Sequence, residues 1–255
     1  MLSSFGSKTF HQISNFGKFI LFSINVVREI FSFRYKFRLV IEQVIHLGIN
    51  SIPIVCFTAL FVGMAFSVQV VKELLRFGAP DLVGGVVGIA IWRELGPLLT
   101  AVVVAGRVGA AITAEIGSMK VNEQVDALNV MGQDSTIYLV APRVVALFFL
   151  LPLLVGLADI VGFLGGLIVA TATSMINYVS FFTSANTMLS SFDSLSGLIK
   201  AAVFSLVISL NATNLGLNVQ YGAQDVGKKT RKSVVLSIVI IFGLNYVLSV
   251  LFFAS

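Results

Sequence analysis

The stretch RELGPLLTAVVVAGRVGAAITAEIGSMKVNEQVDALNVMGQDSTIYLVAPR, from Arg93 to Arg143, joins two apolar segments through a long polar passage. Its first part places four charged residues in or beside an apolar run: Arg93, Glu94, Arg107 and Glu115. Its second part, from Met119 to Met131, has the polar composition of a surface helix. The stretch therefore raises two questions: what the charges in the apolar run contact, and what binds the polar segment.

The composition indicates an integral membrane protein. Of the 255 residues, 57% are hydrophobic and only 11% are charged, and the mean hydropathy is +0.97, well above the soluble average. A soluble core cannot bury so much apolar surface, whereas lipid accepts it if each backbone polar group is paired inside a helix. We therefore expect an all-α transmembrane fold.

Five apolar segments are long enough to span a bilayer. They cover about residues 46–71, 82–117, 144–174, 198–219 and 233–253. The second would form a helix of about 55 Å, longer than a hydrocarbon core of about 30 Å. We expect a kink at Gly96-Pro97, because proline removes a backbone donor. Segments 72–81, 177–196 and 221–232 are predicted to be loops.

Residues 1–45 form a separate N-terminal region, ahead of one membrane domain over residues 46–255. The region is rich in Phe and too frequently charged to span a bilayer. It is predicted to be an amphipathic helix in the membrane interface, with Arg34–Arg38 on anionic lipid. Lys and Arg occur in this N-terminal region, in residues 118–143 and in residues 221–232, whereas residues 177–196 contain none. The positive-inside rule therefore predicts that these three regions face the cytoplasm.

The charges in the second span favour two kinds of contact. Ionisable groups at membrane depth are costly and usually face a bundle interior or a water-filled cavity. In a cavity, the Arg93 fork would suit a phosphate group; at the membrane surface, Arg93 and Glu94 would extend into water instead. Arg107 and Glu115 lie on roughly one helix face and predict salt bridges to a neighbouring helix. Small residues around them predict a close helix contact, within the chain or with a second copy.

The polar segment has the pattern of a short amphipathic helix. Val121, Val125 and Leu128 recur at helical spacing, while Lys120 and other polar residues take the opposite side. A connector between two spans needs few residues, yet this one has about 25. It is either a solvated connector or a cytoplasmic helix that a soluble motor subunit binds.

No enzyme chemistry is predicted from the residue types. One cysteine, Cys56, and two separated histidines, His11 and His46, predict neither a disulfide nor a metal site. The segment GAQDVGKKT at 222–230 nearly matches a phosphate-binding loop, but Lys229 stands where Ser or Thr is required. The four basic residues around its end, Lys228, Lys229, Arg231 and Lys232, instead predict contact with anionic headgroups. We expect no cofactor and no nucleic-acid partner.

Four motifs carry a resemblance to a known family: RELGP, AGRVGAA, AEIGSMKV-EQ-DAL and YLV-PR. Together they resemble the MlaE/YrbE-type permeases, the membrane subunits of Mce-associated ABC lipid transporters, and the related plastid-envelope lipid permeases. The resemblance extends from about residue 45 to the end. It implies five spans, a homodimer, a cytoplasmic ATPase subunit, an Mce-domain substrate-binding protein, and a phospholipid or related glycerolipid as substrate. The membrane would be a bacterial cytoplasmic (inner) membrane or a plastid inner envelope membrane.

The resemblance also implies two sites. A lipid-binding site would contain Arg93, Glu94, Leu95, Phe66 and Phe77. A coupling helix over Met119–Met131 would bind the ATPase through Met119, Lys120, Glu123, Asp126 and Leu128. The chain departs from the family pattern at Asp225 and Lys229, which replace small residues, and at Asp134-Ser135, which replaces Asp-Pro.

Two other functions remain open at this point. The chain is an autonomous ion- or proton-coupled carrier if Glu94, Glu115 and Asp159 act as a relay. It is a structural scaffold if it only anchors a partner. The permease hypothesis differs from both in requiring ATP hydrolysis on another chain.

Overall fold

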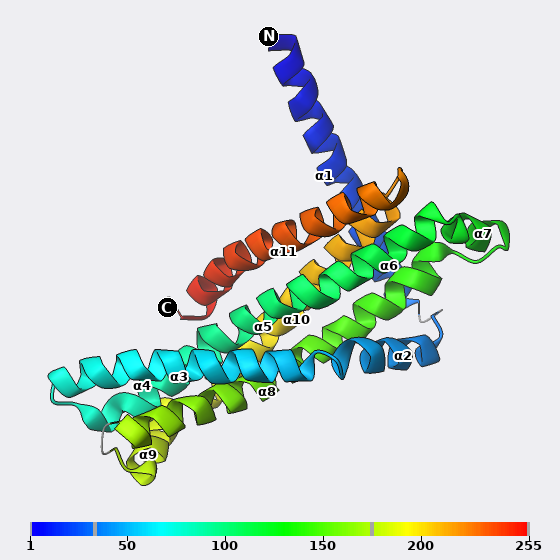
Figure 1. The fold of residues 1–255 in the computed structure, drawn as a ribbon. Coiled ribbons are helices and arrows are strands. Elements are labelled where there is room, and N and C mark those ends of the chain that lie inside the picture. The colour runs from blue at the N-terminus through cyan, green and yellow to red at the C-terminus, as the bar shows by residue number, and fades with distance from the viewer. Residues whose placement is uncertain (1, 33–34, 174–175, 254–255) are drawn as a thin grey trace.

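The computed structural model describes residues 2–32, 35–173 and 176–253. Every regular element in these ranges is a helix, and the helices lie side by side in an elongated bundle (Figure 1). In chain order they are α1 (Leu2–Phe31), α2 (Phe37–Gly48), α3 (Ile52–Arg76), η1 (Pro80–Leu82), α4 (Val83–Ala90), η2 (Ile91–Leu95), α5 (Gly96–Val104), η3 (Ala105–Gly109), α6 (Ala110–Val121), α7 (Gln124–Val130), η4 (Thr136–Val140), α8 (Ala141–Thr173), α9 (Tyr178–Met188), α10 (Ser191–Leu217) and α11 (Gly222–Phe253).

Five helical stretches are long and apolar enough to cross a membrane, which confirms the predicted all-α membrane fold. They are Ile52–Arg76, Pro80–Val121, Thr136–Ala172, Ser191–Leu217 and Gly222–Phe253. The second contains 42 residues in six consecutive helical pieces. At about 1.5 Å per residue it extends about 63 Å, so its ends project beyond a core of about 30 Å.

Two segments predicted to be loops are helical. Within 177–196, the structure contains α9 and the start of α10. The Phe181 ring packs 5.0 Å from that of Phe163 on α8, which buries one face of α9. The 221–232 segment is the first part of α11. Its Lys, Arg and Gln residues favour helix, so a polar composition extends this helix beyond its apolar part instead of ending it.

The N-terminal region forms α1 and α2, and α1 leaves the bundle near the start of α11 (Figure 1). Val26 of α1 packs with Val140 and Val144, and Val40 of α2 packs with Val145. Their position in the membrane interface stays a prediction. Of the predicted lipid contact at 34–38, residue 34 lies outside the described residues.

The bundle core is built on two close helix pairings. α3 runs along α8, where glycines let the backbones meet and the Ser67 hydroxyl donates to the Gly166 carbonyl at 2.8 Å. α10 packs against α5, α6, α8 and α11. We call the two ends of the bundle the α7 end, which also holds the start of α11, and the α9 end, which also holds α4 (Figure 1).

Candidate functional site

The second span changes its helical register at the position of the predicted kink. The wide turn η2 covers Ile91–Leu95, and the Gly96 amide donates to the Ile91 carbonyl, five residues back. Pro97 has no amide hydrogen, so the carbonyl four residues earlier, on Arg93, loses its usual α-helical donor. The Lys200 ammonium of α10 donates to that carbonyl at 2.7 Å. A side chain from another span therefore replaces the missing backbone hydrogen bond.

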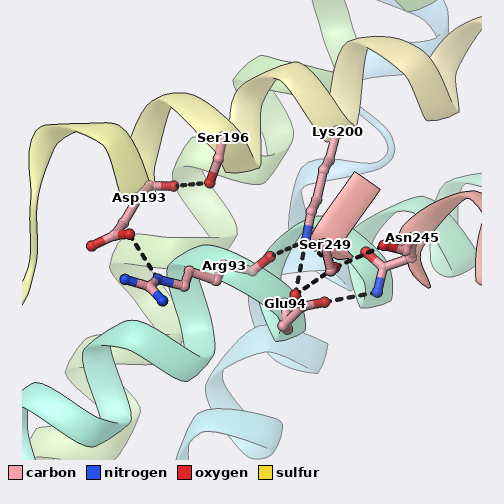
Figure 2. A network of polar contacts seen from close by, with 7 residues as sticks. All are labelled: Arg93, Glu94, Asp193, Ser196, Lys200, Asn245 and Ser249. Atoms are coloured by element: carbon pink, nitrogen blue, oxygen red, sulfur yellow. Dashed lines mark hydrogen bonds and ion pairs between the residues drawn. The ribbon is translucent and has the colours of Figure 1, made fainter. Parts of the chain in front are cut away.

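Glu94 joins three spans through the same lysine. Lys200 Nζ lies 2.9 Å from Glu94 Oε1 and 2.8 Å from the Ser249 hydroxyl of α11. Ser249 Oγ lies 2.7 Å from Glu94 Oε1, and Asn245 Nδ2 donates to Glu94 Oε2 at 2.7 Å (Figure 2). The Lys200 side chain is 0% exposed and that of Glu94 is 38% exposed. Glu94 therefore supplies the counter-charge to a fully buried ammonium.

Arg93 points to the start of α10 and the end of α11. Its Nε donates to Asp193 Oδ1 at 2.7 Å, and its guanidinium carbon lies 4.2 Å from the centre of the Phe253 ring. Asp193 Oδ2 also accepts from the Ser190 amide at 2.8 Å, which completes a capping box on α10. Within the described chain, Nε is the only Arg93 nitrogen with a side-chain hydrogen bond, and 31% of the side chain is exposed. The two terminal nitrogens are thus available to an anion.

An apolar cluster lies on the other side of η2, because Leu95 is two residues, about half a helical turn, from Arg93. Leu95 and Phe66 pack with Trp92 against a cluster around Phe163, whose ring lies 5.2 Å from that of Trp92. A cavity beside Leu95 has a volume of only about 20 Å³, close to the space of one water molecule. One chain therefore provides an apolar wall here, without an enclosed space for an acyl chain.

Phe77 does not belong to this surface. It follows the last residue of α3 and is 79% exposed, outside the cluster that holds Phe66 and Leu95. Its predicted place in the same wall is wrong, because α3 ends at Arg76 and Phe77 lies in the exposed turn before Gly78, which has a φ of +69°.

Asp159 on α8 lies against the same kink. It is buried, and its Oδ1 approaches Gly96 so closely that no side chain fits at that position. In the described part of the chain, Oδ1 has no hydrogen-bond partner. Asp159 thus packs near Glu94 without joining its hydrogen-bond network.

The remaining charges of the second span bind elsewhere. Glu115 Oε1 accepts from Arg143 Nη2 at 2.7 Å, and Arg143 Nη1 donates to the Leu139 carbonyl at 2.7 Å. Arg107 differs from its prediction, because it donates to the backbone carbonyl of Asn50 rather than to a carboxylate. The wide turn η3 at 105–109 explains the difference: it rotates the following helix, so Arg107 and Glu115 meet different partners.

The predicted helix over Met119–Met131 is divided in two. Met119 and Lys120 belong to the end of α6, and Glu123, with a φ of 59°, ends it with a left-handed turn before α7 begins at Gln124. Lys120 Nζ and Asp126 Oδ1 bridge that turn at 2.7 Å. Val125 is buried, Leu128 is partly buried, and Glu123 and Asp126 are exposed. The single helix was a wrong prediction, but the exposed acidic residues cluster at the end of the bundle.

Sequence reasoning missed the partners of Arg93 and Glu94. Asp193, Lys200, Asn245 and Ser249 were not singled out, and all four lie at least 99 positions away along the chain. One signal for Lys200 was available, since it is the only Lys or Arg in the fourth span, Ser191–Leu217. A lone charge in an apolar span usually faces a polar partner.

Comparison with known proteins identifies the family. The family model described as Permease MlaE matches residues 40–251. A probable ABC transporter permease protein of Rickettsia bellii is 39% identical over 251 residues, which cover 98% of this chain and 97% of the relative. A probable ABC transporter permease protein of Synechocystis sp. is 42% identical over 220 residues, covering 86% and 84%.

A plant relative extends the family to plastids. The Arabidopsis thaliana protein TRIGALACTOSYLDIACYLGLYCEROL 1, chloroplastic, is 39% identical over 228 residues, which cover 89% of this chain and 65% of the relative. With five apolar spans, the chain is an integral protein of a bacterial inner membrane or a plastid envelope. The family model and the bacterial relatives each cover most of it. The chain therefore belongs to the MlaE permease family and is the permease subunit of an ABC transporter.

Proposed function

We propose that this permease moves a phospholipid or related glycerolipid between membranes, driven by ATP hydrolysis on a separate subunit. The observation that carries the proposal is the free end of the Arg93 guanidinium, which lies 4.2 Å from the centre of the Phe253 ring on α11, a helix with a largely exposed apolar surface. An anionic headgroup matches the arginine fork, and acyl chains match the apolar surface. The Arabidopsis relative is named after trigalactosyldiacylglycerol, a glycerolipid, which supports the same substrate class.

A second copy of the chain completes the lipid site in this proposal. The cavity of about 20 Å³ beside Leu95 cannot hold an acyl chain. α11 is the least buried of the five spans, so it offers apolar surface to a second copy or to lipid. We infer that the Arg93 and α11 surfaces of two copies face one central space, in a homodimer.

The other two partners bind at opposite ends. The exposed residues Glu123 and Asp126, with Leu128 and the turn after Lys120, form the surface for an ATPase subunit at the α7 end. The α9 end would bind an Mce-domain substrate-binding protein. Closure of the ATPase would push α7, and the continuous second span would carry the movement to Arg93.

A relay of carboxylates is less well supported. Glu94 and Glu115 are 21 positions apart on one continuous helical span, about 30 Å at the helical rise. Asp159 lies beside Gly96, at the Glu94 end. Between Glu94 and Glu115, the described part of the second span therefore offers no further carboxylate to carry a proton or ion.

The test is lipid transfer in a reconstituted system. The chain is co-expressed with a candidate ATPase subunit from the same genome, reconstituted into donor vesicles, and assayed for ATP-dependent transfer of a fluorescent phospholipid. Arg93→Ala should lower transfer at least about tenfold, as expected for losing a bidentate ionic contact. Arg76→Ala is the control, because Arg76 forms an exposed pair with Glu73 at 3.2 Å.

Two results would overturn the proposal. One is equal transfer by the Arg93→Ala and Arg76→Ala proteins when both are folded and bind the ATPase. The other is gradient-driven transport by the chain alone, which would favour the autonomous carrier. Retained transfer by Arg93→Lys would indicate that charge suffices and that the fork is not required.

A further inference from the structure

A shallow, open groove along the first half of α11 lies apart from the Arg93 site. Its described lining residues share one exposed face of the helix: Arg231, Lys232, Val235, Leu236 and Val239. Two cations thus lie at one end of a surface whose other three residues are apolar.

The length of α11 sets the depth of this groove in the membrane. α11 has 32 residues, from Gly222 to Phe253, and about 20 of them cross a hydrocarbon core of about 30 Å. The apolar run begins right after Lys232. Arg231 and Lys232 therefore lie at the boundary between water and hydrocarbon, the depth of lipid phosphates, and Val235 to Val239 lie one to two turns deeper.

The two cations differ from their basic neighbours. Asp225 lies within electrostatic reach of Lys228 and Lys229, one turn earlier on α11. Arg231 and Lys232 are exposed, and neither forms an ion pair with any residue that the structure describes. A cation that is already paired with a carboxylate needs no further anion. Arg231 and Lys232 have no such counter-charge in the described chain, and they lie next to apolar surface.

We propose that this groove binds one anionic phospholipid of the surrounding leaflet, with its phosphate at Arg231 and Lys232 and an acyl chain on Val235, Leu236 and Val239. The charge and the apolar surface have the order and depth of a membrane lipid. Arg231 precedes Asn245, a member of the Glu94 network, by 14 positions on α11, about 21 Å. The phosphate of the bound lipid is therefore at a different depth from the Arg93 site.

Native mass spectrometry of the detergent-solubilised chain with phosphatidylglycerol tests the proposal. Arg231→Gln with Lys232→Gln should lower the retained phosphatidylglycerol at least about fivefold, since anionic contacts near a membrane surface contribute about 1 kcal/mol per cation. Lys228→Gln with Lys229→Gln removes the same charge one turn away, and should change retention less than about twofold. Phosphatidylcholine, without net charge, should bind weakly to all three proteins.

Further variants separate a built groove from simple charge attraction. Val235→Trp with Val239→Trp keeps every cation but fills the apolar part, and should also reduce the retained phosphatidylglycerol. Excess inorganic phosphate should not displace the lipid if the acyl chain contributes. Equal losses from the two Gln pairs, no loss from either, or displacement by phosphate would overturn the proposal. The proposal would also be overturned if changing Arg231 and Lys232 reduced only the co-purification of the ATPase and left the retained phosphatidylglycerol unchanged.

Discussion

Lys200 connects a backbone defect to a side-chain network. Pro97 leaves the Arg93 carbonyl without its α-helical donor, and the Lys200 ammonium donates to that carbonyl while it pairs with Glu94. Burying a charge is unfavourable unless it is paired and hydrogen-bonded. Here one ammonium has three acceptors, on Arg93, Glu94 and Ser249. The kink and the buried charge therefore stabilise each other.

Replacing this lysine should destabilise the protein. Lys200→Met removes the counter-charge of Glu94 and the donor to the Arg93 carbonyl, and removing one partner of a buried pair costs about 3–5 kcal/mol. Unfolding of the purified protein in detergent, followed by circular dichroism, measures the change. Lys120→Met is the matched control, because its pair with Asp126 is partly exposed and such pairs contribute less than about 1 kcal/mol.

A double variant checks the cause. Adding Glu94→Gln to Lys200→Met removes the unpaired carboxylate, so the double variant should be more stable than Lys200→Met alone. If both lysine variants unfold at the same denaturant concentration, the Lys200 network does not stabilise the fold.

At the residue level, the sequence predicted which side chains need partners but not what those partners are. Arg93, Glu94 and Glu115 stood out because a charge in an apolar span is costly. Their partners Asp193, Lys200 and Arg143 come from other helices. Pairing across helices depends on how each helix is rotated, and a single sequence does not contain that information.

At the level of helices, wide turns limit what periodicity predicts. Two such turns, η2 and η3, lie within the continuous second span, and η4 begins the third. η2 contains Arg93, η3 contains Arg107 and η4 ends three residues before Arg143, and each arginine reaches another element. One extra residue in a turn rotates the following helix by about 100°. Hydropathy predicted the five spans, and Pro97 indicated where the second span is irregular, but neither predicts the change in backbone register at η2.

The pairing of α3 with α8 depends on a glycine. A methyl group at Gly63 would lie 2.0 Å from the Gly162 carbonyl oxygen, so the two backbones would have to separate. Gly63→Ala should therefore destabilise the bundle by about 1–3 kcal/mol, as overpacking does elsewhere. Unfolding in detergent measures the loss.

Gly156→Ala gives the contrast within α8. Nothing lies within 4 Å of the methyl group that this substitution adds. Since alanine favours helix over glycine by about 1 kcal/mol, this variant should be as stable as the parent or slightly more so. Equal destabilisation by the two alanines would show that helix propensity, rather than the close approach at Gly63, controls the result.

At the scale of the whole molecule, two polar networks lie at different positions on one continuous helical span. The Glu94 network joins η2 to α10 and α11, and the Glu115 to Arg143 pair joins α6 to α8 near the α7 end. Between them the span is unbroken from Pro80 to Val121. A displacement of α6 at one network would therefore move the other, because helices resist compression along their axis. This connection gives the proposed transporter a physical path from its ATPase to its lipid site.

The pair at Glu115 tests that path. Glu115→Gln removes the charge on a half-exposed side chain, while Arg143 keeps its bond to the Leu139 carbonyl, so the fold should persist. We expect ATPase binding and hydrolysis to continue and lipid transfer per ATP to fall several-fold, because α6 and α8 then move less closely together. Glu73→Gln, at an exposed carboxylate of α3 that pairs with Arg76 outside both networks, should leave that ratio unchanged. An unchanged ratio in Glu115→Gln would mean that force reaches the lipid site without this pair, through the axis of the second span alone.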